Sequence, residues 1–142
     1  MLAAKITVMP EKKTLARAKR DKRQGKAPGT QAGEFVREEM DHIRQGKHGA
    51  RSTRQAIAIG LSKARRAGVE LKPPKEGSAS KRTRTRAQRD LRKGQSGSRR
   101  KPSAKRSRAT SRALKREGHS AASKRSLSRQ ARSAAARRKK AA

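Results

Sequence analysis

The side chains that could do chemistry in this chain are few, and most lie between residues 34 and 48. An acidic run comprises Glu34, Glu38, Glu39 and Asp41. With His42, Asp41 and Glu38 could form a metal or acid/base site on one helix, but a charged helix face of this kind is usually only solvated. The run is better explained as compensation of charge at a helix N-terminus, or equally as a partner for the basic tail of the same molecule. His42, His48 and His119 are isolated, without a second ligand at metal spacing. We therefore expect no metal, no cofactor and no catalytic residue.

Other motifs of enzyme chemistry are absent from the sequence. Without cysteine, the chain has no disulfide framework, no thiolate metal site and no cysteine nucleophile. The loop that begins Gly46-Lys47 is not a phosphate-binding loop, because no strand precedes it and the Gly-Lys-Ser/Thr ending is missing. The sequence predicts a protein that is not an enzyme.

Charge and composition favour a polyanionic partner. The 142 residues include 43 Lys and Arg against 10 Asp and Glu, a net charge of +33. Val, Ile, Leu and Phe number only 15, too few at this net charge for one core spread over the whole chain. Neutralising phosphates releases condensed counterions and provides affinity that does not depend on sequence. Nucleic acid is the partner that this composition favours.

Membrane and export signals are missing. Nowhere do 18 apolar residues follow one another, and the N-terminus has no secretory apolar region. The basic tail lacks Trp or Phe to insert into lipid. We expect a cytoplasmic, nucleoid-associated protein with no membrane role.

Three segments differ in composition, and they predict a mainly α protein. Residues 1–30 form a basic arm in which 12–26 could become helical on phosphates, with Pro28 and Gly29 ending that helix. Residues 31–72 carry eight of the fifteen large aliphatic or Phe residues and predict a short antiparallel two-helix hairpin. Residues 73–142 are a tail rich in Arg, Lys, Ser and Ala, which we expect to be largely disordered and to become helical on a polyanion.

Periodicity and cap signals place the two helices of the hairpin. Val36, Met40 and Ile43 recur at helical spacing between residues 32 and 45, with Thr30 as a candidate N-cap. In the second helix, at 52–67, Ser52 and Gln55 form a capping-box pattern. Gly46 and Gly68 are the expected C-terminal caps. A further set of small residues lies along one side of the second helix, where another helix could approach closely: Ala56, Gly60 and Ala64.

A helix pair of this size is marginal alone, so we expect dimerisation or docking of another segment or protein partner. In the tail a weak repeat relates 89–96 to 112–120, with Leu91 and Leu114 in corresponding positions. Each copy predicts a helix, a glycine cap and the N-cap of the next helix.

Basic side chains of the helix pair and the tail are the candidate phosphate contacts. The chain has one Phe and neither Trp nor Tyr, so it lacks the rings on which single-strand binders stack bases, and duplex DNA is favoured over RNA. RNA or ribosome binding, or a plasmid-maintenance role in which the helix pair binds a protein, are the alternatives. The candidate residues are Arg51, Arg54, Arg65, Arg66, Arg99, Arg100, Lys101, Lys105, Arg106, Arg108, Arg112, Lys115, Arg116, Lys124, Arg125, Arg137, Arg138, Lys139 and Lys140.

Residues 34–68 resemble a small bacterial domain family of unknown function. The resemblance rests on a Met shortly before a Gly-Lys turn and on the string STRQAIAIGLSKARRAG at 52–68. The string LKREGHSAASKRSLSRQARSAA, at 114–135, is similar to a segment that recurs in the same group. Relatives usually have such basic tails, and some are labelled DNA-binding or plasmid stabilisation proteins, so the resemblance implies DNA binding. The tail also resembles histone-H1-like proteins in composition.

Overall fold

The regular structure of the protein is helical. The computed structural model describes residues 10–97 and 103–142, and it contains no named strand within those ranges. A short 3-10 helix, η1 (Ser120–Ala122), precedes the last helix. The α-helices are α1 (Lys12–Arg23), α2 (Pro28–Arg44), α3 (Thr53–Arg66), α4 (Lys81–Ser96), α5 (Ala104–Arg116) and α6 (Lys124–Ala141). The predicted mainly α class is confirmed, and no helix of the described ranges is long and apolar enough to cross a bilayer.

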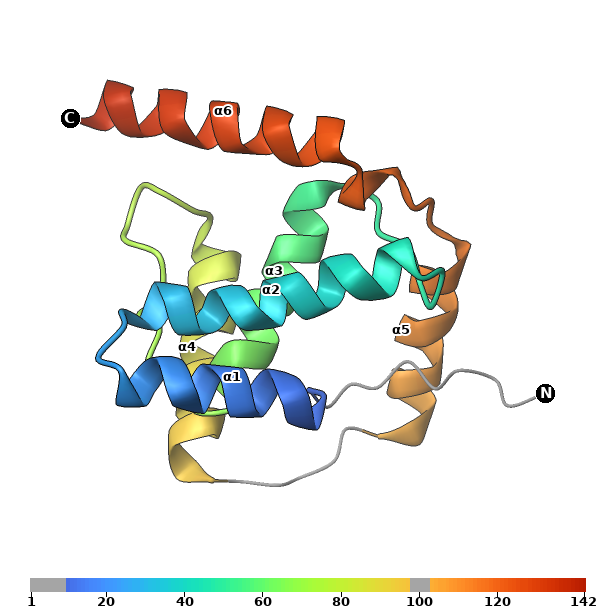
Figure 1. Ribbon diagram of the computed structural model, residues 1–142, viewed down its shortest axis with the longest axis horizontal. Coiled ribbons are helices and arrows are strands. Elements are labelled where there is room, and N and C mark those ends of the chain that lie inside the picture. The colour runs from blue at the N-terminus through green and yellow to red at the C-terminus, as the bar shows by residue number, and fades with distance from the viewer. Residues whose placement is uncertain (1–9, 98–102) are drawn as a thin grey trace.

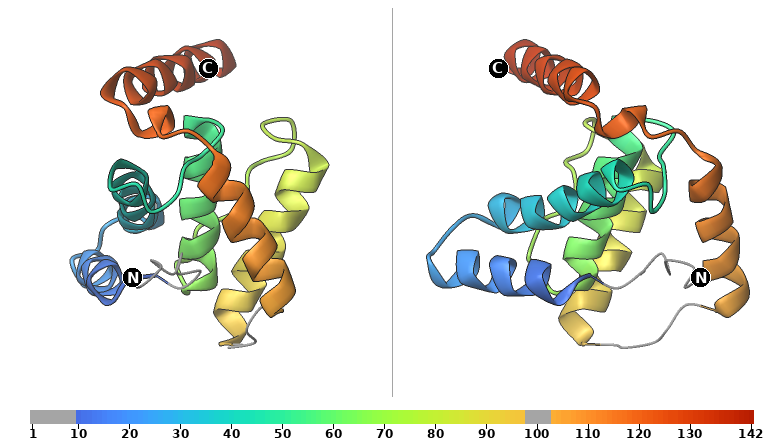
Figure 2. Two further views of the ribbon diagram at one scale, coloured as in Figure 1. Left: turned by 90° about the vertical axis from the view of Figure 1, so that its right-hand side faces the viewer. Right: turned by 45° about the vertical axis from the view of Figure 1, so that its right-hand side comes forward.

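The helices at the centre form two crossing layers. Figure 1 shows α1 beside α2, and Figure 2 shows this pair crossing α3 and α4 at a steep angle. The helix pair α2–α3 is therefore present, but its members cross steeply where the sequence suggested an antiparallel hairpin. α6 lies across one end of α3, and α5 stands apart from the two layers (Figure 2).

The crossing of α2 and α3 depends on the small residues of α3. A Cβ added at Gly60 would lie 2.7 Å from the Cα of Val36, so only glycine allows the backbones to come this close. Ala56 and Ala64, on the same strip, are fully buried. The strip of small residues that the sequence predicts as a site of close approach is thus the surface of α3 on which α2 packs.

The ends of α2 and α3 follow from local chemistry. α2 begins at Pro28, with Ala27 at the N-cap, because the fixed φ of proline suits the first turn. The prediction that Pro28 ends a helix and that Thr30 caps the next is therefore wrong. The glycine caps are confirmed: Gly46 and Gly68 both have positive φ, and after Gly68 the N–H of Val69 donates to Ala64 O at 3.0 Å.

Packing extends beyond residues 31–72 on both sides. α1 covers one end of α2, where Ala18 and Leu15 contact the cluster around Phe35. α4 packs on α3 so closely that a Cβ at Gly94 would lie 1.9 Å from Arg65 O. Apart from Leu15 and Phe35, small residues make these contacts, so the large apolar side chains of the sequence do not indicate the packing of α4 on α3.

The segment just before α6 docks on the loop between α2 and α3. The N–H of Gly49 donates to Leu114 O at 2.9 Å, and the N–H of Ala50 donates to Gly118 O at 3.0 Å. Beyond these bonds Ala121 and Ala122 are buried in the cluster around Met40. The docking of another segment that the helix pair was expected to need is supplied by the chain itself.

The Gly60 contact gives a test of the crossing. Gly60→Ala should destabilise the fold by about 1–3 kcal/mol, because the new methyl group overlaps the backbone of α2. Gly33→Ala is the matched control: Gly33 is an exposed position of α2 with open space around its Cβ, so this change should be neutral or stabilising by up to about 1 kcal/mol. Urea unfolding followed by circular dichroism measures both. Equal effects of the two substitutions would contradict the close crossing.

Candidate nucleic-acid interface

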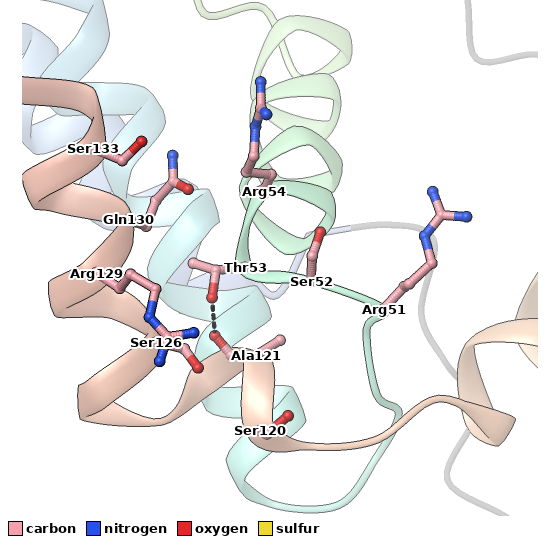
Figure 3. A pocket seen from close by; sticks show the side chains of 10 residues that line it. All are labelled: Arg51, Ser52, Thr53, Arg54, Ser120, Ala121, Ser126, Arg129, Gln130 and Ser133. Carbon is pink, nitrogen blue, oxygen red and sulfur yellow. Dashed lines mark hydrogen bonds between the residues drawn. The ribbon is translucent and has the colours of Figure 1, made fainter. Parts of the chain in front are cut away.

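A polar, basic cleft of about 350 Å³ lies between the start of α3 and one face of α6. Figure 3 shows side chains of α6 lining the cleft opposite the first residues of α3. The lining residues are Arg51, Ser52, Thr53, Arg54, Ser120, Ala121, Ser126, Arg129, Gln130 and Ser133. Three of them are arginines and none is acidic. Such a lining can donate many hydrogen bonds to an anion, and it carries no negative charge that would repel the anion.

Helical spacing places the α6 side of the cleft. Ser126, Arg129, Gln130 and Ser133 are three, four and seven residues apart, so they share one face of α6. The guanidinium of an arginine presents a planar fork of donors that matches the oxygens of a phosphate. This face of α6 therefore carries phosphate-binding chemistry toward α3.

Two local motifs fix the α3 side. At the floor of the cleft, Thr53 Oγ1 donates to Ala121 O at 2.6 Å (Figure 3). Ser52 caps α3, with its Oγ accepting from the N–H of Gln55 at 3.2 Å. The side chain of Gln55 accepts from the N–H of Arg51 at 2.6 Å and not from Ser52, so the predicted capping box closes one residue early.

Most of the candidate residues named from the sequence lie on the surface. Arg51 and Arg54 line the cleft, and those of α5 and α6 are exposed along their helices. Arg65 is different: it is 7% exposed, and its guanidinium donates to Leu71 O and Lys72 O at 3.1 and 3.3 Å. Burial lowers the pKa of Arg65 below its ordinary value. Arg99, Arg100 and Lys101 lie outside the described residues.

The sequence search did not single out Arg129 and Gln130. A signal for them exists in the pattern His-x-Ala-x-Ser, which occurs at 48–52 and again at 119–123. In both places the Ser caps the helix that follows. Thr53, directly after the first copy, donates to Ala121 of the second, and the helices that follow the two copies form the two sides of the cleft.

Acidic and basic side chains are segregated by the fold. Four of the ten acids are buried, namely Asp21, Glu38, Glu39 and Asp90, and two are exposed. Of the 39 Lys and Arg residues in the described ranges, 34 are exposed. The surface is therefore more uniformly positive than the composition alone implies.

The acidic run of α2 faces inward and not toward solvent. Lys63 of α3 is buried, donates a hydrogen bond to Glu39 Oε1, and lies 3.7 Å from Glu38 Oε1. His48 Nε2 lies 3.1 Å from the second oxygen of Glu39. The interpretation of this run as a solvated face or as compensation at the helix N-terminus is wrong for Glu38 and Glu39, because α2 begins at Pro28 and turns both inward.

Charges in this cluster shift one another's pKa. Burial opposes ionisation of Glu39, but hydrogen bonds with His48 and Lys63 outweigh it and hold the pKa of Glu39 below its ordinary value. The same hydrogen bond to Glu39 raises the pKa of His48, against the effect of burial. At the edge of the cluster, the hydrogen bond with His42, 2.8 Å away, lowers the pKa of Glu11 to about 2.

The buried ion pair gives a second prediction. Lys63→Met should cost about 3–5 kcal/mol of unfolding free energy, because it leaves two buried carboxylates without their cation. The double variant Lys63→Met, Glu39→Gln should lose less unfolding free energy than Lys63→Met alone, because Gln at position 39 removes one of the two uncompensated carboxylates. The exposed Lys72, substituted by Met, should change stability by no more than about 0.5 kcal/mol. Denaturant unfolding measures all three, and a loss below about 1 kcal/mol for Lys63→Met would contradict the paired cluster.

A third prediction concerns acid. Because the pKa of Glu11 is about 2 in the folded protein and 4.5 as its ordinary value, folding favours its ionised form. Its contribution is therefore complete above pH about 4.5 and is lost as the pH falls toward 2. Glu11 is faced by His42, Lys13 and Lys47. Glu11→Gln should lower stability at pH 7 but not at pH 2, as measured by urea titrations across this range. A stability difference that does not change with pH would exclude this coupling, and the exposed Glu70→Gln is the control.

Comparison with family models, with curated proteins and with solved structures finds no match to this chain. The resemblance of residues 34–68 to a bacterial domain family therefore stays a prediction. Function has to be argued from the cleft, the charge distribution and the buried cluster themselves.

Proposed function

We propose that the protein is a non-enzymatic DNA-binding protein that neutralises the phosphates of duplex DNA with little sequence preference. The observation that carries this proposal is the segregation of charge: 34 of 39 described Lys and Arg residues are exposed, while only two of the ten acids are. A surface of this kind displaces counterions from a nucleic acid and draws affinity from their release.

The cleft between α3 and α6 is the proposed anchor point. Arg51, Arg54 and Arg129 line it together with serine hydroxyls, and none of its lining residues is acidic. Contacts from arginines and hydroxyls to phosphates position a protein on a duplex without reading its sequence. α5 and α6 extend the surface, with six and eight basic residues and no acid in either helix.

The burial of Phe35 favours a duplex over a single strand as the ligand. Phe35 is the chain's one Phe, with no Trp or Tyr, and it is 1% exposed. Proteins that grip single strands stack bases on exposed rings, and no such ring is available to this protein. Backbone contacts to a duplex lose nothing by this absence. RNA binding, with or without the ribosome, is the alternative that the experiment below separates.

A salt titration tests the proposal. If about 8 phosphates are contacted, affinity for duplex DNA should fall on the order of a thousandfold or more between about 50 and 200 mM salt. Fluorescence anisotropy with a labelled duplex measures this, with structured RNA as competitor at equal salt. A flat salt response, or absence of binding in dilute buffer, would refute the proposal. Tighter binding of the RNA would favour the alternative.

Matched triple variants locate the interface. Arg51, Arg54 and Arg129, all replaced by Ala, should reduce the slope of log affinity against log salt by about 2.7, because three phosphate contacts are lost. The control replaces Lys19, Arg20 and Arg23 of α1, which are exposed and lie away from α6 (Figure 1). It removes the same net charge and should change the slope by less than about one. Equal losses in the two variants would show that charge matters but the cleft does not.

A further inference from the structure

The buried cluster of α2 contains a set of metal-ligating atoms that the proposed function does not use. Glu39 and His42 lie three residues apart on α2, and His48 follows in the next loop. Their exposures are 1%, 6% and 2%. Each offers one ligand atom, and these three atoms all lie within 4.8 Å of one another.

The donor set selects the class of metal. Two imidazole nitrogens and one carboxylate oxygen match the three-ligand sites of zinc, which leave a fourth position open. Mg²⁺ and Ca²⁺ prefer sites built from oxygen alone. The three side chains therefore favour a zinc-class ion.

The proton arrangement around His48 suits a ligand. Its Nδ1 lies 2.8 Å from Gly49 O, and because a carbonyl oxygen can only accept, Nδ1 carries the proton. Nε2 faces Glu39 and donates to that carboxylate in the metal-free protein, so it would release this proton when it binds a metal. A backbone carbonyl that fixes one ring nitrogen while the other meets the metal is the usual setting of a metal-bound histidine.

The carboxylate of Glu39 is divided between two partners. Lys63 donates a hydrogen bond to Oε1, and Oε2 lies 3.1 Å from His48 Nε2. Two donor atoms on one tetrahedral zinc ion stand about 3.3 Å apart, given bonds near 2.0–2.1 Å. An ion can therefore enter between these two atoms with a shift of a few tenths of an ångström, while Lys63 keeps its hold on the other oxygen.

A buried carboxylate oxygen next to this cluster lacks a hydrogen bond. Glu38 Oε1 belongs to a side chain that is 2% exposed, and it has no hydrogen-bond partner. It lies 3.9 Å from His42 Nε2 and 3.7 Å from Lys63 Nζ, too far for a hydrogen bond to either. A buried carboxylate oxygen left without a hydrogen bond is costly, and a metal ion or a water bound to it would satisfy that oxygen.

We propose that Glu39, His42 and His48 bind one Zn²⁺ ion per chain. Binding takes the ion between the lone pairs of the two imidazoles and the Glu39 carboxylate, and it releases the proton of any imidazole that is protonated beforehand. The site would join α2 to the loop on which residues 114–122 dock.

The experiment uses the full chain, treated with chelator, dialysed and kept free of nucleic acid. Titration with Zn²⁺ by calorimetry should give one site per chain, and Co²⁺ should give the strong visible absorption of a tetrahedral ion. His48→Gln and His42→Gln should each weaken binding by at least about tenfold. His119→Gln is the matched control, because His119 is exposed and lies outside the cluster.

Failure of the folded wild-type chain to bind Zn²⁺, or full affinity in a folded His48→Gln variant, overturns the proposal. Circular dichroism shows whether each variant folds. Should the His48 and His42 variants not fold, the wild-type Co²⁺ spectrum decides, since only a weak octahedral spectrum would mean that these ligands are not used. Because DNA is absent, failure here leaves the proposed function untouched.

Discussion

The structure depends on one buried interaction, the ion pair between Lys63 of α3 and the carboxylates of α2. Two acids and a lysine that lose water on folding are tolerated only when they neutralise one another, and Glu39 does so with Lys63 on one oxygen and His48 on the other. Together with the small residues around Gly60, this pairing sets which faces of α2 and α3 meet. It also draws the loop after α2 inward, and that loop is the surface on which residues 114–122 dock.

The same interaction shapes the outside of the molecule. Each acid turned inward is removed from a surface that already carries few of them, so positive charge outside follows from charge pairing inside. Repulsion among these surface cations destabilises the folded protein. The apolar packing that opposes this repulsion is weak, because it consists of alanines and a few large side chains. Added salt screens that repulsion while it weakens attraction to phosphates. Stability and binding should therefore respond to salt in opposite directions.

Much of the central helix pair could be predicted from the sequence, because its signals are local. The glycine caps, the Ser52 cap and the small strip around Gly60 each depend on residues within one or two turns. The packing of α1 and α4 could not be predicted in this way. Those helices bury few large apolar side chains, and their buried acids pair with nearby cations, Asp21 with Lys26 of the loop after α1 and Asp90 with Arg66 of α3. Such contacts leave no apolar periodicity in the sequence. The inward turn of Glu38 was missed for a related reason: a helix start placed four residues late put the acids at the wrong end.

The cleft illustrates how a basic tail can contribute to a defined surface. Its first half belongs to the helix pair and its second half to α6, so neither segment contains the site alone. α5 has none of this support: no side chain in it is buried, and it carries six cations without an acid. A helix of thirteen residues is marginal in water without packing, and repulsion among its cations opposes it further. In the proposed complex phosphates would remove that repulsion, so the order of α5 should depend on DNA far more than the order of α2 or α3, which pack on one another through both apolar clusters and the buried ion pair.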